Sequence, residues 1–167
     1  MQSQNKTINS TRRPLSRVGR APATGDAVVV ECRAARTSSA CRCPLIGWRV
    51  EAGFPSPAED YLEGTLDLNE FLVENPAATF FVRVTGESMR DAGILPGDLL
   101  VVDRSRTAQS GDVVIAVVDG QMAVKRLWCK GRRVELRPAN REFPTIRLAG
   151  TMELEVWGVV RHVIHSV

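Results

Sequence analysis

The sequence of 167 residues predicts an all-β, mostly antiparallel domain with one short helix, preceded by a flexible basic arm. After residue 78, short apolar runs alternate with turns rich in glycine, proline and aspartate, which is typical of many short strands. Only residues 67–76 combine a helical spacing of apolar side chains with start and stop signals. These observations indicate a sandwich-like sheet or a partly closed barrel.

The N-terminal arm differs from the rest of the chain in composition and charge. Residues 1–26 are rich in Ser, Thr, Asn, Arg, Pro and Gly and show no helical or strand period, so we expect disorder there. Residues 1–52 carry nine Lys/Arg and three Asp/Glu, a net charge of +6, whereas residues 53–167 carry thirteen and sixteen, a net charge of −3. A basic arm can contact nucleic acid or an acidic surface, or can simply be a solvated tail.

Several functional classes are disfavoured by what the sequence lacks. Residues 1–43 offer no pair of helical patterns for a helix-turn-helix, and the globular part is acidic, so we expect no direct sequence-specific DNA binding. No apolar run approaches the ~20 residues that span a bilayer, and no secretory signal is visible, so we expect a cytoplasmic protein with no membrane association.

The cysteines do not have the spacing of a metal site. Zinc ligands are usually two to four residues apart, whereas only one residue separates Cys41 from Cys43, and Cys32 and Cys129 are isolated. We therefore expect free thiols in a reducing compartment, no metal and no cofactor.

The segment between the arm and the helix is predicted to be extended. Residues 27–32 form a short apolar run that is compatible with a strand. Trp48 and Val50 alternate with charged residues, and Pro55 and Pro57 then exclude a helix. A protease cleft accepts such an extended segment by strand pairing, although an ordinary linker has the same composition.

The predicted helix over residues 67–76 has a cap, an apolar face and a stop signal. Asp67 can cap its first turn, with Glu70 completing a capping-box pattern. Leu68, Phe71 and Leu72 fall on one face, and Pro76 ends the helix.

The remaining chain is predicted to be β-structure. Asp119-Gly120 between two apolar runs is a strong hairpin signal. The expected strands cover residues 79–84, 99–102, 113–118, 122–128, 134–136, 146–148, 154–159 and 160–164.

A serine and a lysine stand out as candidate catalytic residues. Ser88 follows the strand at 79–84, behind Gly86, and Lys125 lies inside an apolar strand 37 residues later. Serine is a poor nucleophile until a base takes its proton, and the two histidines, His162 and His165, lie close to the end of the sequence, which disfavours a Ser-His-Asp triad. A neutral lysine can act as the base if burial lowers its pKa from the ordinary value of ~10.4.

The turn around Ser88 predicts an exposed hydroxyl and unpaired backbone N–H groups. The N–H groups of Ser88 and Met89 are candidates for holding the oxyanion of a tetrahedral intermediate. Two simpler readings stay open: Ser88 hydrogen-bonds within its turn, and Lys125 points outward while Val124 points inward.

Several segments together resemble the self-cleaving Ser-Lys peptidase domain of the LexA and UmuD family. The resemblance covers about residues 44–165. Ala52-Gly53 is similar to the scissile bond of that family, and its distance of 36 residues from Ser88 is similar to that in the UmuD branch. The other similar segments are Gly86-Glu87-Ser88-Met89, Gly97-Asp98-Leu99-Leu100-Val101-Val102-Asp103, Gly111-Asp112-Val113-Val114 and Val124-Lys125-Arg126-Leu127.

The resemblance implies a fold, a reaction and partners. It implies a LexA-like peptidase β fold in which Ser88 attacks the Ala52 carbonyl while neutral Lys125 accepts its proton. A RecA–single-stranded DNA filament would stimulate the cut, which removes residues 1–52 as the arm. The fragment 53–167 would dimerise and serve as accessory subunit of an error-prone, UmuC-like Y-family translesion polymerase in the SOS response.

Three other functions remain open. An autocleaving LexA-type repressor needs a DNA-reading domain, which residues 1–43 do not offer. A Ser-Lys signal peptidase needs a membrane anchor, and no such segment is visible. In a non-catalytic polymerase-binding module, Ser88 and Lys125 would be remnants.

Overall fold

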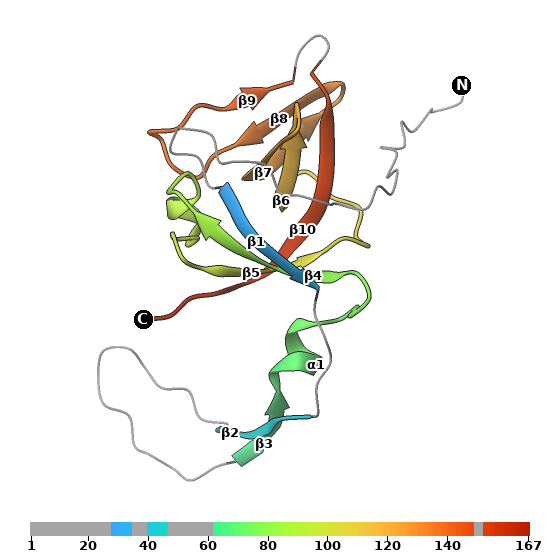
Figure 1. Ribbon diagram of the computed structural model, residues 1–167, viewed down its shortest axis with the longest axis vertical. Helices are drawn as coiled ribbons and strands as arrows, with labels where there is room; N and C mark the ends of the chain where they lie inside the picture. The colour runs from blue at the N-terminus through green and yellow to red at the C-terminus, as the bar shows by residue number, and fades with distance from the viewer. Residues whose placement is uncertain (1–27, 35–39, 47–61, 149–151) are drawn as a thin grey trace.

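The computed structural model describes residues 28–34, 40–46, 62–148 and 152–167. Their strands form an eight-stranded antiparallel sheet in the order β1-β4-β5-β10-β6-β7-β8-β9 and a two-stranded sheet of β2 and β3 (Figure 1). The predicted all-β, mostly antiparallel fold with one short α-helix is confirmed. The elements are β1 (Val28–Ala34), β2 (Arg42–Ile46), β3 (Leu62–Asp67), α1 (Leu68–Leu72), β4 (Thr79–Thr85), the 3₁₀ helix η1 (Arg90–Ala92), β5 (Leu99–Asp103), β6 (Val113–Val118), β7 (Gln121–Lys130), β8 (Arg133–Arg137), β9 (Ile146–Arg147) and β10 (Leu154–Ile164).

The predicted hairpin between β6 and β7 is confirmed. Asp119 and Gly120 have φ angles of 48° and 80°, the positive values that a two-residue type I′ turn requires at both central positions. The turn pairs Val118 with Gln121 and continues to Val113 opposite Arg126. This hairpin brings Lys125 into the middle of the sheet.

The C-terminal β-structure corrects one prediction. Residues 154–159 and 160–164 are not two strands, because β10 runs without a break from Leu154 to Ile164. Its first half pairs with β6 and its second half with β5, with register shifts between Val156 and Gly158 and between Val160 and His162. Bulges of this kind bend a strand and increase its twist, so one strand serves two neighbours.

The helix begins where predicted but is shorter than predicted. The Asp67 carboxylate accepts a 2.8 Å hydrogen bond from the backbone N–H of Asn69, so it is the N-cap. The helix ends at Leu72 rather than near Pro76, because its C-cap Val73 leaves the helical conformation, with a φ angle of −116° and a ψ angle of 83°. A separate turn follows, in which the Asn75 carbonyl accepts hydrogen bonds from the Ala78 N–H and the Thr79 hydroxyl.

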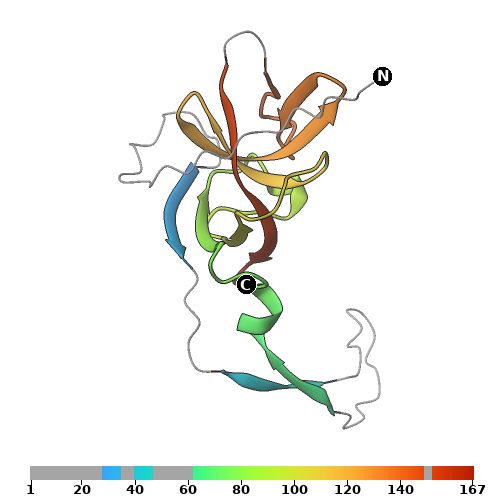
Figure 2. The ribbon, with the colours of Figure 1, turned by 90° about the vertical axis from the view of Figure 1, so that its right-hand side faces the viewer.

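The two-stranded sheet of β2 and β3 was not predicted. Arg42 pairs with Asp67 and Pro44 with Thr65, and the Asp67 carboxylate also accepts a 2.9 Å hydrogen bond from the backbone N–H of Cys41. Two views place this sheet beyond α1, away from the eight-stranded sheet (Figures 1 and 2). The extended stretch expected at Trp48 and Val50 lies outside the described residues.

Two apolar clusters form the core. The first combines Met89 and Ile94 of the turn after β4 with residues of five strands, and the second lies between β6, β7, β8 and β10. The fully buried residues of the first cluster include Val82, Leu100, Val102, Ile115 and Val124, and the second contains Val114, Ala116, Leu127, Leu136 and Val159.

Among the described residues, no helix is long and apolar enough to cross a membrane.

Candidate active site

Ser88 lies in a tight turn that β4 leads into. The strand ends at Thr85, and Gly86 adopts a φ angle of 84°, a left-handed conformation that glycine reaches without strain. Met89 follows with a fully buried side chain, and η1 begins at Arg90. The buried methionine therefore anchors the turn in the first apolar cluster immediately beside the serine.

Lys125 reaches this turn from the centre of β7. Its side chain is completely buried, and its Nζ atom lies 2.8 Å from the Ser88 Oγ atom, as a hydrogen bond requires. Val114, opposite Lys125 on β6, and Leu127, two residues along β7, belong to the second apolar cluster. The reading in which Lys125 points outward is therefore wrong.

The Ser88 side chain is buried, which corrects the expectation of an exposed hydroxyl. The residue has 0% of its surface exposed. The Lys125 amine lies against the hydroxyl, and the Ser88 carbonyl accepts a 2.8 Å hydrogen bond from the backbone N–H of Ala139. A buried hydroxyl beside an amine is suited to proton transfer, because water competes poorly for either group.

Ala139 and Asn140 hold the turn that contains Ser88 through hydrogen bonds. Ala139 donates to Ser88, its own carbonyl accepts a 2.7 Å hydrogen bond from the Asp91 N–H, and the Asn140 side chain donates 3.0 Å to the Glu87 carbonyl. Asn140 is only 3% exposed. Sequence reasoning missed this segment, because Asn140 lies 53 residues from Glu87 and belongs to no recognisable motif.

The predicted oxyanion donors lie among the described residues, but the predicted scissile bond does not. Within the described part of the chain, the backbone N–H groups of Ser88 and Met89 donate to no protein acceptor. The oxyanion role of these two groups stays a prediction. The Ala52-Gly53 bond lies outside the described residues.

The two histidines have other partners. His165 Nδ1 lies 2.6 Å from Asp98 Oδ1, and the His162 ring lies 5.9 Å from the ring of Phe71. Ser88 is instead paired with Lys125, so the geometry favours a lysine base over a histidine base.

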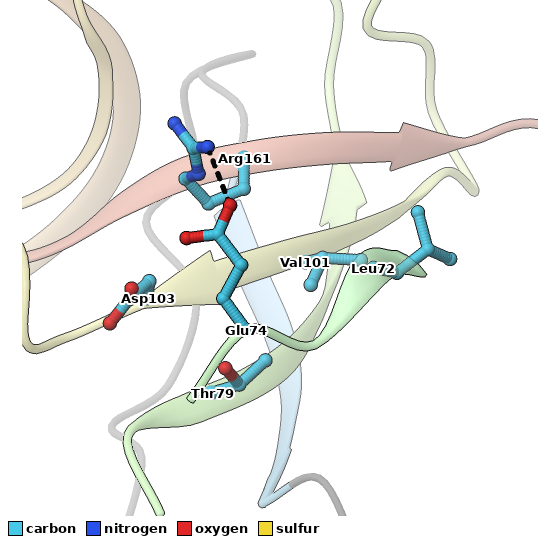
Figure 3. Close-up of a pocket in the computed structure, with 6 residues that line it drawn as sticks. All are labelled: Leu72, Glu74, Thr79, Val101, Asp103 and Arg161. Atoms are coloured by element: carbon cyan, nitrogen blue, oxygen red, sulfur yellow. Dashed lines mark hydrogen bonds and ion pairs between the residues drawn. The ribbon is translucent and has the colours of Figure 1, made fainter. Parts of the chain in front are cut away.

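A shallow hollow occurs elsewhere on the molecule. It lies between the end of α1 and strands β4, β5 and β10, and Figure 3 shows the Glu74 carboxylate across it, pointing toward Arg161. These two groups are 3.0 Å apart. Neither Ser88 nor Lys125 is among the lining residues, which are Leu72, Glu74, Thr79, Val101, Asp103 and Arg161.

The chain is similar to a known protein family and to several known proteins. The peptidase S24-like family matches residues 44–161, a range that includes both Ser88 and Lys125. Protein ImpA of Salmonella typhimurium is 51% identical over 122 residues, which cover 73% of this chain and 83% of ImpA. Protein MucA of Escherichia coli is 47% identical over 120 residues, covering 71% of this chain and 82% of MucA. The LexA repressor of Idiomarina loihiensis is 46% identical over 103 residues, which cover 62% of this chain but only 49% of the repressor.

Proposed function

This chain belongs to the peptidase S24-like family, and we propose that it cuts itself at the Ala52-Gly53 bond with Ser88 as nucleophile and Lys125 as base. The family supports a self-cleaving serine peptidase in general terms. The observation that carries the specific assignment is the 2.8 Å contact between Lys125 Nζ and Ser88 Oγ, with both side chains completely buried.

The proposed reaction has two steps. Ser88 Oγ forms a bond to the Ala52 carbonyl carbon while neutral Lys125 takes the hydroxyl proton, and the N–H groups of Ser88 and Met89 stabilise the oxyanion. The Ala52-Gly53 bond then breaks, and the proton passes from Lys125 to the departing Gly53 amine. In the second step water hydrolyses the Ala52 ester and restores the serine. Burial favours this route, because an apolar environment disfavours the charged form of an amine.

The relatives support a proposal for the biological role. ImpA, SamA and MucA are UmuD-like SOS mutagenesis proteins, and this chain covers more than four fifths of each. We propose that the cut divides the chain into an arm, residues 1–52, and an active fragment, residues 53–167. The fragment would dimerise and serve an error-prone Y-family polymerase as accessory subunit, and a RecA–single-stranded DNA filament would stimulate the cut. The reaction would occur in the cytoplasm.

The LexA-type repressor is the second candidate. A LexA repressor matches 62% of this chain, but that match spans less than half of the repressor. The UmuD-like role is therefore the better supported of the two.

The test is self-cleavage of the purified full chain at alkaline pH. Mass spectrometry should find a fragment that begins at Gly53 in the wild type and none in Ser88→Ala or Lys125→Met, the latter of which keeps most of the side-chain volume. Ser166→Ala, at an exposed serine, is the matched control and should cut normally. Persistence of the cut in both site variants would overturn the Ser88–Lys125 assignment. Absence of the fragment from the wild type as well would favour the non-catalytic binding module.

A further inference from the structure

One face of the β7–β8–β9 corner concentrates basic side chains around a tryptophan. In the antiparallel register, Arg126 pairs with Arg137, Trp128 with Glu135, Lys130 with Arg133, and Glu135 with Arg147. Directly opposed residues of neighbouring strands point to the same side of a sheet, as do alternate residues along one strand. These seven side chains therefore share one side, which we call the basic face, namely Arg126, Trp128, Lys130, Arg133, Glu135, Arg137 and Arg147.

The basic face has a marked surplus of positive charge. It contains five cationic side chains and a single carboxylate, although residues 53–167 as a whole carry a net charge of −3. Arg126 and Lys130 are exposed, and the side chains of Arg133 and Arg147 are 61% and 69% exposed. The surplus is therefore presented to solvent and is not an average property of the chain.

The single carboxylate organises the face rather than neutralising it. Glu135 is only 4% exposed on its side chain and lies 2.7 Å from Arg133, 2.8 Å from Arg137 and 3.4 Å from Arg147. The Arg137 guanidinium, hydrogen-bonded to Glu135, holds the pKa of this carboxyl below its ordinary value, and Arg133 adds to the effect. One fixed anion thus holds three guanidinium groups close together.

Trp128 adds a planar surface to the charge. The Arg137 guanidinium carbon lies 4.0 Å from the centroid of its ring, and that of Arg133 lies 5.9 Å away. Indole and guanidinium groups are the surfaces on which unpaired bases stack. A run of acidic side chains would pair with the charges but would leave the planar surface unused, whereas a nucleic-acid strand uses both.

We propose that the basic face binds single-stranded nucleic acid without sequence preference, with phosphates contacting the basic side chains and bases stacking on Trp128 and Arg137. The face lies on the last strands of the eight-stranded sheet, at the end of the molecule away from α1 (Figure 1). This activity goes beyond the proposed function, because it uses neither Ser88 nor the cut.

The test is fluorescence anisotropy of a labelled oligothymidine with the full chain, in a Ser88→Ala background that keeps one molecular species. Arg133→Gln/Arg147→Gln should weaken binding about tenfold at moderate salt and reduce the salt-dependence slope by about 1.4, because each lost phosphate contact removes about 0.7. The matched control is Arg83→Gln/Arg106→Gln, which loses the same charge from β4 and from the turn after β5 and should bind as the parent does.

Four outcomes would overturn the proposal. Equal weakening of binding in both double variants would assign binding to overall charge. Unchanged binding in both would assign it to the basic residues 1–52. Tighter binding of the matching duplex would exclude a single-strand site. Displacement of the oligonucleotide by polyglutamate at equal charge concentration would indicate an acidic protein segment as the partner.

A second double variant provides the test if the first one does not fold. If thermal unfolding shows that Arg133→Gln/Arg147→Gln is not folded, Arg126→Gln/Lys130→Gln leaves the ion pairs of Glu135 intact and should weaken binding in the same way. Unchanged binding in this folded variant would equally refute the proposal. Wild-type self-cleavage, measured in parallel, fails or succeeds independently of the binding result.

Discussion

The side-chain amide of Asn140 donates a 3.0 Å hydrogen bond to the backbone carbonyl of Glu87, the residue immediately before Ser88. With the Ala139 N–H bonded to the Ser88 carbonyl, two consecutive carbonyls of the turn are held by one short segment. The position of the Ser88 hydroxyl relative to Lys125 therefore depends on residues that touch neither reacting group.

We expect Asn140→Ala to slow self-cleavage about tenfold or more, because small errors in placing a nucleophile are costly. Asn140 acts as a positioning residue, so the pH dependence of the remaining activity should keep its shape. Asn75→Ala, which removes an exposed amide contact to Ser105, is the control and should cut at the parent rate. A wild-type rate in Asn140→Ala would show that the backbone bonds of Ala139 suffice.

Self-cleavage should accelerate as the pH rises above neutrality. The proposed base is the deprotonated form of Lys125, so the active fraction grows until the amine is fully neutral and the rate then levels off. Stopped time courses of the full chain, read by gel densitometry, measure the rate at each pH. A rate that does not change between about pH 5 and about pH 10 would count against a lysine base, since a lysine whose pKa is lowered by burial should gain its neutral form within that range.

Glu135→Gln should destabilise the fold at neutral pH and much less in acid. The pKa of Glu135 is lowered in the folded state, so its carboxylate stabilises the fold above its unfolded pKa of about 4.3, and that contribution is lost as the pH falls through the folded value. Thermal unfolding at pH 7 and at acidic pH should show that the difference in melting temperature between the wild type and Glu135→Gln becomes smaller in acid. Glu63→Gln, at an exposed residue of β3, is a suitable control. If the difference in melting temperature between the wild type and Glu135→Gln does not change with pH, the charge of Glu135 does not stabilise the fold.

Gly158→Ala should destabilise the fold by about 1–3 kcal/mol, the usual cost of overpacking a core. A Cβ atom at residue 158 would lie 2.6 Å from Val102 Cγ1 and 3.3 Å from the Asp103 carbonyl oxygen. Chemical denaturation measures the free energy of unfolding.

A double-mutant cycle tests this explanation. Val102→Ala removes the nearest atom, so Gly158→Ala should cost less in that background than in the wild type. Simple additivity would mean that the backbone conformation of β10, rather than the contact with Val102, requires glycine.

Most strands could be predicted because their signals are local. The Asp119-Gly120 turn and the apolar run before it define β6 with its observed bounds, Val113–Val118. The β2–β3 pair was missed because its strands are joined by residues 47–61 and no turn signal predicts their pairing. The single strand β10 was divided in two because its bulges arise from pairing with two different neighbours, which periodicity does not reveal.

The candidate site was predictable to the same degree. Ser88 and Lys125 have local signals, a turn after a strand and a lysine among apolar neighbours, and the structure brings them together. The support from Ala139 and Asn140 has no local signal, because it is a contact between segments far apart in the sequence. The basic face was hidden in the same way, since three strands contribute to it and the net charge of residues 53–167 is negative.

Because β1 pairs with β4 and β2 pairs with β3, the proposed cut would also change both sheets. Both β1 and β2 precede residue 52, so departure of the arm would remove two strands and not only a tail. The outer edge of β4 and the paired edge of β3 would then have backbone N–H and C=O groups without strand partners, and such edges readily accept a strand from another chain. Hydrolysis of one peptide bond would thus turn a protein that completes its own sheets into one that recruits the missing strands.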